Sequence, residues 1–295
     1  MKKLFKTFVA LAAVAALGFS FVSCKNNDDD NGSGSPSSGG GNGAATGNNG
    51  SGKSQSGNSG YIGTKAPSEA KAVGDIVFND GSATPYTNAR YLSYEKKQAA
   101  VAVIFYAGSS ADVLGAKTLG VGLNEIGGAF ASIGTTGYTT NFTEIQCTPD
   151  NCDEEGQGGD AGTAKFTGDL DGSDNWAKIC ATDKTAEENA ETNYPLFYKI
   201  NNYGTEYNLT GDYQSGWYVP TVAELSMLHR VRDTVNAAFP YVGRGGYLLT
   251  GYYISSSQCS GLVECVFVVN LKSGYIGHEE KKSRYNFYCR PIRAF

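Results

Sequence analysis

The sequence has little of the side-chain chemistry on which common hydrolases depend. Among its 295 residues, only two are histidines, two are methionines and two are tryptophans, and charged residues make up 18%. The two histidines, His229 and His278, stand too far apart for the HExxH pattern of zinc proteases. A GxSxG nucleophile elbow is absent as well. We therefore assign no catalytic residue and predict a protein that is not an enzyme.

The chain also lacks an excess of positive charge. Its formal net charge is −5, and it becomes −8 once the three lysines of the first 23 residues are removed. A negative protein is repelled by phosphate backbones and by anionic lipid headgroups. We therefore expect no nucleic-acid partner.

Beyond the N-terminus, no run of apolar residues is long enough to cross a bilayer. The apolar run at residues 8–22 follows Lys2, Lys3 and Lys6, and it is too short to be a comfortable membrane span. We predict a lipoprotein signal peptide at residues 1–23, with Cys24 as the acylated first residue of the mature protein. An ordinary signal peptide with an incidental cysteine is the alternative. A lipid at Cys24 would anchor the protein to the outer membrane, exposed at the cell surface.

Residues 24–60 have almost no apolar side chains and consist mainly of Asn, Gly, Ser and Asp. Such a segment cannot offset the entropy lost on ordering, so we expect a disordered linker. A Gly/Ser coil of this length spans on the order of 30–35 Å. The remaining residues, 61–295, have the length of one domain.

Disulfide bonds are permitted by export but are not required by the cysteine spacing. Six cysteines follow Cys24, and six allow 15 pairings. Cys147 and Cys152 flank a Pro-Asp-Asn turn and could close a small loop, which the sequence leaves open. The six are Cys147, Cys152, Cys180, Cys259, Cys265 and Cys289.

The hydrophobic pattern predicts an α+β domain of antiparallel strands with two helices and long loop insertions. "VGDIVFNDG" and "AAVAVIFYAG" are typical of strands, "SYEKKQ" of a short helix, and residues 135–174 of loops. A longer helix begins after Pro220, where Thr221 and Glu224 predict a capping box. Its apolar face continues to Val235, and Pro240 ends it. Successive antiparallel strands follow, and the strand around Phe267 alternates as if one face were partly exposed.

Acidic residues in "DLDGSDNW" could offer oxygen ligands to calcium. Asp169, Asp171 and Asp174 depart from the EF-hand spacing and lack its bidentate glutamate. We favour a solvated Asx turn and predict neither a metal nor a cofactor.

The C-terminal region is rich in tyrosine among Ser, Gly and Asn. This composition is typical of binding surfaces, because tyrosine gives large contact area at low entropic cost. Core packing is the alternative, which we favour for Tyr253 and Tyr288. The tyrosines are Tyr247, Tyr252, Tyr253, Tyr275, Tyr285 and Tyr288.

Five motifs in order, "GDIVFNDG", "DGSDNWAKIC", "GWYVPTVAEL", "YISSSQ" and "RPIRAF", resemble the treponemal variable lipoproteins. Those proteins are targets of diversity-generating retroelements. The resemblance implies a C-type lectin fold of the formylglycine-generating-enzyme type, with a variable ligand-binding region at about 247–295. Tyr253-Ile254 and Val266-Phe267 depart from the family's Tyr-Trp and Ala-Trp pairs.

The resemblance divides the C-terminal region into scaffold and variable positions. Scaffold positions should be buried or turn-forming: Ser255, Ser256, Ser257, Phe267, Val269, Leu271, Gly274 and Ile276. The positions between them are candidates for a diversified ligand-binding surface: Tyr252, Cys259, Gly261, Val263, Glu264, Val268, Lys272, Ser273, Tyr275, Gly277, His278, Glu279 and Glu280.

These positions imply a surface-displayed lipoprotein that binds a protein ligand on host or other cells. One rival is an oxidase of the sulfatase-modifying type on the same fold, using Cys259, Cys265 and Cys289 with copper. Another is a surface coat protein that does not vary.

Overall fold

The computed structural model describes residues 60–295 except 244, 247–248 and 283–286. The predicted signal peptide, Cys24 and the linker up to residue 59 lie outside the described residues, as do Tyr247 and Tyr285. Within the described ranges, no helix has the length and apolar character needed to cross a bilayer.

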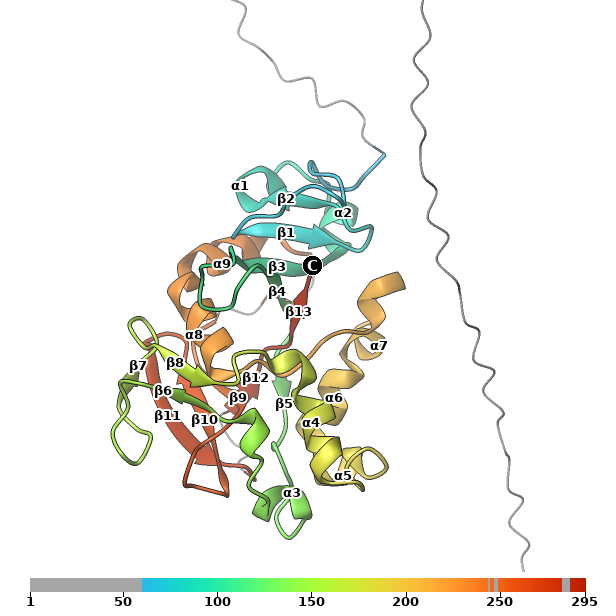
Figure 1. Ribbon diagram of the computed structural model, residues 1–295. Coiled ribbons are helices and arrows are strands. Elements are labelled where there is room, and N and C mark those ends of the chain that lie inside the picture. Colours follow the sequence, from blue (N-terminus) through green and yellow to red (C-terminus); the bar gives the residue numbers. More distant parts are fainter. Residues whose placement is uncertain (1–59, 244, 247–248, 283–286) are drawn as a thin grey trace, which may run out of the picture. The chain divides into compact units, whose positions relative to one another are not determined.

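The first sheet joins the two ends of the described chain. Its strands are β1 (Asp75–Phe78), β2 (Ala83–Pro85), β3 (Ala100–Ala107), β4 (Thr118–Gly122) and β13 (Ile292–Ala294), in the order β13-β4-β3-β1-β2. All pairs are antiparallel. Figure 1 shows the red C-terminal strand β13 beside the green strand β4. The predicted strands at β1 and β3 are confirmed.

The second sheet is built mainly from the C-terminal region. It contains β5 (Ile126–Gly127), β7 (Gly159–Asp160), β9 (Tyr252–Gln258), β10 (Cys265–Asn270), β11 (Tyr275–Glu280) and β12 (Phe287–Cys289), in the order β5-β12-β9-β10-β11-β7. Strands β9, β10 and β11 form the predicted antiparallel series. The prediction was wrong for the last two strands, because β12 pairs with β9 in parallel and β13 joins the other sheet.

The region predicted as loops holds only short elements. Strands β6 (Cys147–Pro149) and β8 (Phe166–Gly168) form a two-stranded sheet, and α3 (Thr136–Thr139) is a single turn. Two 3₁₀ turns, Thr143–Ile145 and Gly172–Asp174, and the strand β7 of the second sheet complete the stretch.

The helices outnumber the two that the sequence predicted. The helix expected at "SYEKKQ" is α2 (Tyr94–Gln98), whose Ser93 caps the Lys96 N–H. The others are α1 (Tyr86–Ala89), α4 (Asn175–Thr182), α5 (Ala190–Asn193), α6 (Pro195–Asn201), α7 (Tyr203–Glu206), α8 (Val222–Arg230) and α9 (Arg232–Ala238). Two 3₁₀ turns, Gly211–Gln214 and Phe239–Tyr241, lie among them.

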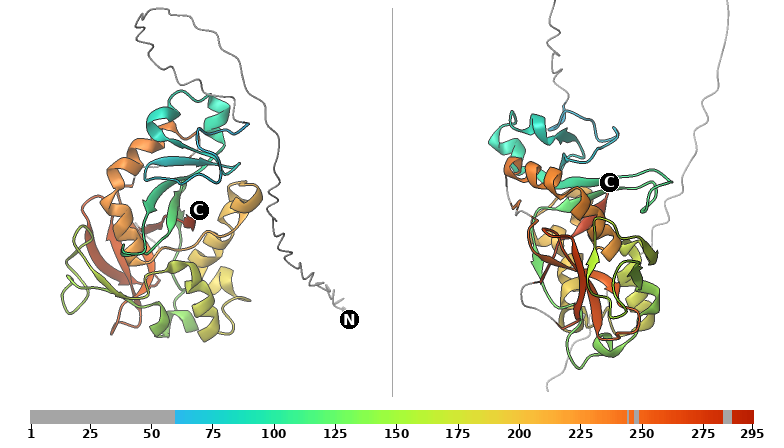
Figure 2. Two further views of the ribbon diagram at one scale, coloured as in Figure 1. Left: turned by 45° about the horizontal axis from the view of Figure 1, so that its top comes forward. Right: turned by 90° about the vertical axis from the view of Figure 1, so that its left-hand side faces the viewer.

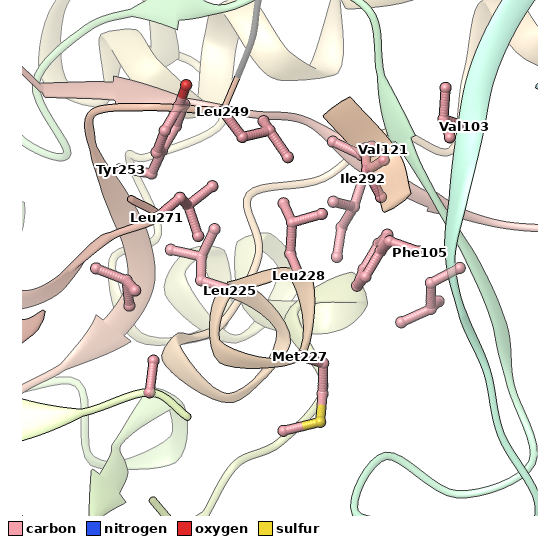
Figure 3. Close-up of a cluster of buried hydrophobic side chains, with 14 of the residues drawn as sticks. Val103, Phe105, Val121, Leu225, Met227, Leu228, Leu249, Tyr253, Leu271 and Ile292 are labelled. Carbon is pink, nitrogen blue, oxygen red and sulfur yellow. The ribbon is translucent and has the colours of Figure 1, made fainter. Parts of the chain in front are cut away.

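Helix α8 lies between the two sheets and begins with the predicted capping box. The Thr221 hydroxyl accepts from the Glu224 N–H, and the Glu224 carboxylate accepts from the Thr221 N–H. Figure 3 shows Leu225 and Leu228 pointing from this helix among apolar side chains of both sheets. The expected single helix instead breaks at Val231, whose φ of −114° and ψ of 10° are not helical, before α9 begins.

The centre of β10 is buried on both faces, so the expectation that Val266 and Val268 face outward was wrong, whereas Asn270 of the same set is half-buried. Phe267 and Val269 belong to the apolar cluster that contains α8, whereas Val266 and Val268 pack in a second cluster with side chains of α4 and α6. In the views of Figure 2 these yellow helices lie beside the red strands. Burying each valine contributes roughly 1.5–3 kcal/mol.

The Glu224 side chain connects the start of α8 and the residues just before it to the turn at Gly172, which lies 52 residues earlier in the sequence. One carboxylate oxygen accepts from the N–H groups of Thr221 at 2.8 Å and Gly172 at 3.2 Å, and the other accepts from the Tyr218 hydroxyl at 2.9 Å. Only 1% of Glu224 is exposed. Burial raises its pKa to about 7, although these donors favour the charged form. Glu224 therefore fixes both the start of α8 and the loop before α4.

We predict that Glu224→Ala lowers the free energy of unfolding by about 3 kcal/mol, because several buried donors lose their acceptor. Glu224→Gln should cost much less, since its amide oxygen can accept the two N–H groups and its NH₂ can donate to the Tyr218 oxygen. Urea unfolding followed by circular dichroism measures both. Equal losses for the two variants would contradict the role of these hydrogen bonds.

Candidate functional site

The candidate variable positions do not form one surface. Those with exposed side chains gather at two opposite ends of the β9-β10-β11 meander. Strand β10 separates the ends by about 17 Å, at roughly 3.3 Å per residue. One end carries Tyr252, Lys272, Ser273 and Tyr275, and the other carries Gly261, Val263 and Glu264, with Glu279 and Glu280 half-buried beside them.

At the first end, three aromatic rings form what we call the aromatic patch: Tyr252, Tyr275 and Phe287. The Tyr252 ring lies 6.3 Å from the Tyr275 ring and 5.8 Å from the Phe287 ring, both edge-on. Tyr252 pairs with Phe287 across the parallel strands, and Asn270 lies opposite Tyr252 on β10. Tyr252 and Tyr275 are each 37% exposed. Three strands thus present one aromatic surface.

The turn beside the aromatic patch is held by hydrogen bonds. The Asn270 side-chain oxygen accepts from the Lys272 N–H at 2.9 Å and the Ser273 N–H at 3.0 Å. Gly274 has a φ of +83°, and a Cβ there would lie 2.7 Å from a ring nitrogen of His229. The predicted turn-forming role of Gly274 is therefore confirmed.

Side chains of the helices α8 and α9 also contact the backbone of this turn. A ring nitrogen of His229 lies 3.0 Å from the Leu271 carbonyl oxygen. The Arg232 guanidinium donates to the carbonyls of Leu271 and Lys272. At the patch itself, the Tyr275 hydroxyl donates to the Gln157 side chain at 2.7 Å. The patch is thus presented by a fixed backbone.

Three candidate positions are buried, so the prediction that they lie on an exposed surface was wrong. Cys259 and Val268 are each only 2% exposed, because both sheet faces are covered by packed side chains. Gly277 is also buried, and a Cβ there would lie 2.5 Å from the Gln157 side-chain oxygen. His278 is half-buried.

The scaffold positions are buried as predicted. Each serine of the "SSS" run has its own partner: the Ser255 hydroxyl donates to the Phe267 carbonyl, Ser256 accepts from the Asn175 amide, and Ser257 accepts from the Val222 N–H. The serines therefore satisfy polar groups inside the core. Phe267, Val269, Leu271 and Ile276 are fully or almost fully buried.

Of the two tyrosines predicted to fill the core, Tyr253 does so and Tyr288 does not. Tyr253 is 1% exposed and its hydroxyl donates to the Glu125 carboxylate, which also pairs with the buried Arg290 at 3.2 Å. Tyr288, predicted to fill the core, is exposed instead. Sequence reasoning missed Asn270, Phe287 and Gln157, of which only the Asn before "LKSG" carried a turn signal.

At the opposite end of the meander, a buried lysine supports the loop that carries Glu264. The Lys281 ammonium donates to the carbonyls of Gly137 at 3.0 Å and Thr140 at 2.7 Å. The backbone N–H of Lys281 donates to the Glu264 carbonyl at 2.7 Å. The Tyr138 hydroxyl donates to the Glu264 carboxylate at 3.0 Å. Burial lowers the pKa of Lys281 to about 7.

The aspartates of "DLDGSDNW" form ion pairs with lysines. The Asp171 side chain accepts from the Ser173 N–H, which confirms the predicted Asx turn. Lys178 pairs with Asp169 at 3.1 Å and with Asp174 at 2.7 Å. Across the described part of the chain, no group of three or more His, Cys, Asp and Glu side chains is arranged to hold a metal ion.

The six described cysteines are free thiols, so Cys147 and Cys152 do not close a loop here. Of the three cysteines that the rival oxidase would use, Cys259 and Cys265 lie on one side of the second sheet and Cys289 lies apart from them. Cys259 packs in the cluster on the α8 side of the second sheet, whereas Cys289 packs in the cluster on its opposite face.

Comparisons with known proteins show the fold alone. No protein-family model matches the chain, and no curated protein matches its sequence. A fimbrial protein from Bacteroides ovatus ATCC 8483 is similar in structure, with a TM-score of 0.52 and 16% identity. The similarity covers 76% of this chain and 49% of that one. This neighbour is consistent with the α+β fold of helices and antiparallel sheets.

We predict that the stability contribution of Lys281 changes with pH. Its folded pKa of about 7 lies below the ordinary lysine pKa of 10.5, so the native state binds the proton less tightly than the unfolded chain. Stability is therefore greatest above pH 10.5 and is lost as pH falls toward 7. Wild type should gain stability relative to Lys281→Met by up to about 1.4 kcal/mol per pH unit between pH 7.5 and 9. A constant difference in unfolding free energy would contradict this.

Proposed function

We propose that this chain is a surface-displayed lipoprotein that binds a protein ligand through the aromatic end of its second sheet. The aromatic patch and the turn at Lys272 and Ser273 form the binding surface. The observation that carries this proposal is the cluster of three edge-packed rings, two of them more than one-third exposed, on backbone held from behind.

This surface has the chemistry of a protein-binding site. Tyrosine combines an apolar ring with a hydroxyl, and it is enriched among residues that dominate binding energy. The turn adds a lysine and a serine whose side chains are exposed. Because Asn270, Gly274 and Arg232 fix the backbone, side chains can differ without changing the scaffold. Such a preformed surface loses little entropy on binding.

The C-type lectin fold and retroelement-driven diversification belong to the same proposal. They are supported by the five ordered motifs and by the buried scaffold positions of the C-terminal region. Direct contact with the ligand is limited to the exposed candidate positions, which excludes the buried Cys259, Val268 and Gly277. Lipidation at Cys24 and outer-membrane display rest on the sequence of the first 60 residues.

A structural role in a surface assembly is the second candidate. It is favoured by the similarity to a fimbrial protein. A chain with such a structural role would associate with copies of itself as its concentration rises. A ligand-binding protein would keep one mass in light scattering at all concentrations.

We predict that the double variant Tyr252→Ala/Tyr275→Ala loses at least about 30-fold in affinity for a partner found by screening the chain against extracellular proteins. Removing one interface anchor costs about 2 kcal/mol, and one such loss already gives this factor. Surface plasmon resonance measures the affinities.

The matched control is Tyr91→Ala/Tyr94→Ala. These tyrosines are 74% and 69% exposed and lie near α2, on the other sheet's side of the domain. The control should bind as wild type does, and both double variants should keep the wild-type circular dichroism spectrum. Equal affinity losses in both pairs, or none at the aromatic patch, would contradict the assignment of the binding surface.

A further inference from the structure

Cys259 and Cys265 lie directly opposite each other where the β9-β10 hairpin opens into its loop. Gln258 pairs with Val266, and the next pair outward is Cys259 with Cys265, joined by a hydrogen bond from the Cys259 N–H to the Cys265 carbonyl at 3.2 Å. The Cys265 N–H donates instead to the Leu262 carbonyl at 3.0 Å, so the strand pairing ends at these two residues. Directly opposite residues of antiparallel strands have Cα atoms about 4.5–5.5 Å apart. Disulfides join Cα atoms separated by roughly 4.4–6.8 Å.

Both side chains also project from the same face of the hairpin. Cys259 belongs to the apolar cluster on the α8 side of the sheet, and Cys265 packs against that cluster, whereas Val266 packs in the cluster on the opposite face. Facing side chains are the second requirement for a bridge, because cysteines that point to opposite faces cannot be joined.

We propose that Cys259 and Cys265 form a cross-strand disulfide that closes the loop between β9 and β10 under oxidising conditions. This site is independent of ligand binding at the aromatic patch. The closed loop carries Gly261, Val263 and Glu264, which are exposed at the far end of the meander.

Access to the two sulfurs sets the order of the reaction. Cys265 is half-buried, whereas Cys259 is almost fully buried beside a cavity of about 240 Å³ that Cys152 and Phe267 also line. The Cys265 thiolate attacks an oxidant disulfide, such as oxidised glutathione or a thiol–disulfide oxidoreductase, and releases one thiolate. The Cys259 thiolate then attacks the Cys265 sulfur of the mixed disulfide and releases the second. Two protein thiols are oxidised, and one oxidant disulfide is reduced to two thiols.

The environment of the two thiols makes this exchange slow without a catalyst. Burial raises the pKa of Cys259 and of Cys265, and the carboxylates of Glu280, Glu264 and Glu279 raise the pKa of Cys265 further. The thiolate is the attacking species, so little of it is present at neutral pH. An enzyme of disulfide formation in the export compartment would overcome this limit.

Cys152 is the competing partner, since it lies against the same cluster and lines the same cavity as Cys259. Its position differs in one respect. A Cβ built at Gly159 would lie 2.5 Å from the Cys152 sulfur, so this thiol lies against the backbone at Gly159. Cys265 has no such obstacle and is held opposite Cys259 by the strand register.

Peptide mapping of the full chain after incubation with oxidised glutathione and a catalytic thiol–disulfide oxidoreductase tests the proposal. Free thiols are alkylated in denaturant, and the chain is then cleaved at glutamate, which separates Cys259 from Cys265 at Glu264. We expect the two resulting peptides to remain joined until a reductant is added. We also expect the oxidised chain to melt at a higher temperature than the reduced chain.

Substitutions at two cysteines identify which thiols form the bond. Cys265→Ser, at a half-buried position, should abolish both the linked peptides and the shift in melting temperature, and Cys152→Ser should leave both unchanged. Cys180, half-buried on α4, should stay alkylated throughout and serves as the internal reference. A Cys152–Cys259 link, or complete alkylation of Cys259 and Cys265 in a chain with native circular dichroism, would overturn the proposal.

Discussion

The N-terminus of helix α8 is the junction on which the rest of the domain depends. Here the Glu224 carboxylate accepts hydrogen bonds from Thr221, from Tyr218 and from Gly172, while the Ser257 hydroxyl accepts from the N–H of Val222. Helix N-termini leave backbone donors that must find acceptors when buried. Because Glu224 of the helix itself and Ser257 of β9 supply these acceptors, the chain can bury a helix between two sheets. The strand β9, which carries Ser257, is thereby fixed to the helix.

A consequence of this junction is that the second sheet can be covered on both faces. Helix α8 packs on one face, and helices α4 and α6 supply side chains to the other. Only the ends of the central strands remain exposed. The aromatic patch lies at one end, and the loop with Val263 and Glu264 lies at the other. Side chains at the strand ends and turns can therefore be substituted while the sheet beneath them stays unchanged.

Local signals in the sequence predicted local structure well. The Thr221–Glu224 capping box, the short helix capped by Ser93 and the buried strand β3 each depend on neighbouring residues, and each is present. Helices α5 and α7 are single turns with few apolar residues, so no periodic pattern marked them. The parallel pairing of β12 and the return of β13 to the first sheet join segments far apart in sequence, which hydrophobic period cannot specify.

Within the candidate site, too, some residues were predicted correctly from the sequence and others were not. From the family resemblance we predicted that the serine run is buried, that Gly274 forms a turn and that Tyr252 and Tyr275 are exposed, and these placements are confirmed. The resemblance also placed Val268 and Cys259 on the surface. For Val268 the reason is that an alternating strand predicts one buried face and cannot reveal that remote helices cover the other. Cys259 lies on the α8 side of the sheet, among apolar side chains with Phe267 and Val269. Phe287 was missed since it lies in a segment that did not align with the family.

Sequencing this gene and its surrounding locus in many isolates tests the diversified binding surface most directly. We expect a neighbouring reverse-transcriptase gene and a near-copy of the 3′ coding segment. Substitutions should gather at Tyr252, Lys272, Ser273 and Tyr275 and in the loop between β9 and β10, where the copy carries adenines. Codons for Ser255 to Ser257, Phe267 and Gly274 should stay constant. Substitutions spread evenly over the domain, with no copy nearby, would contradict a diversified binding surface.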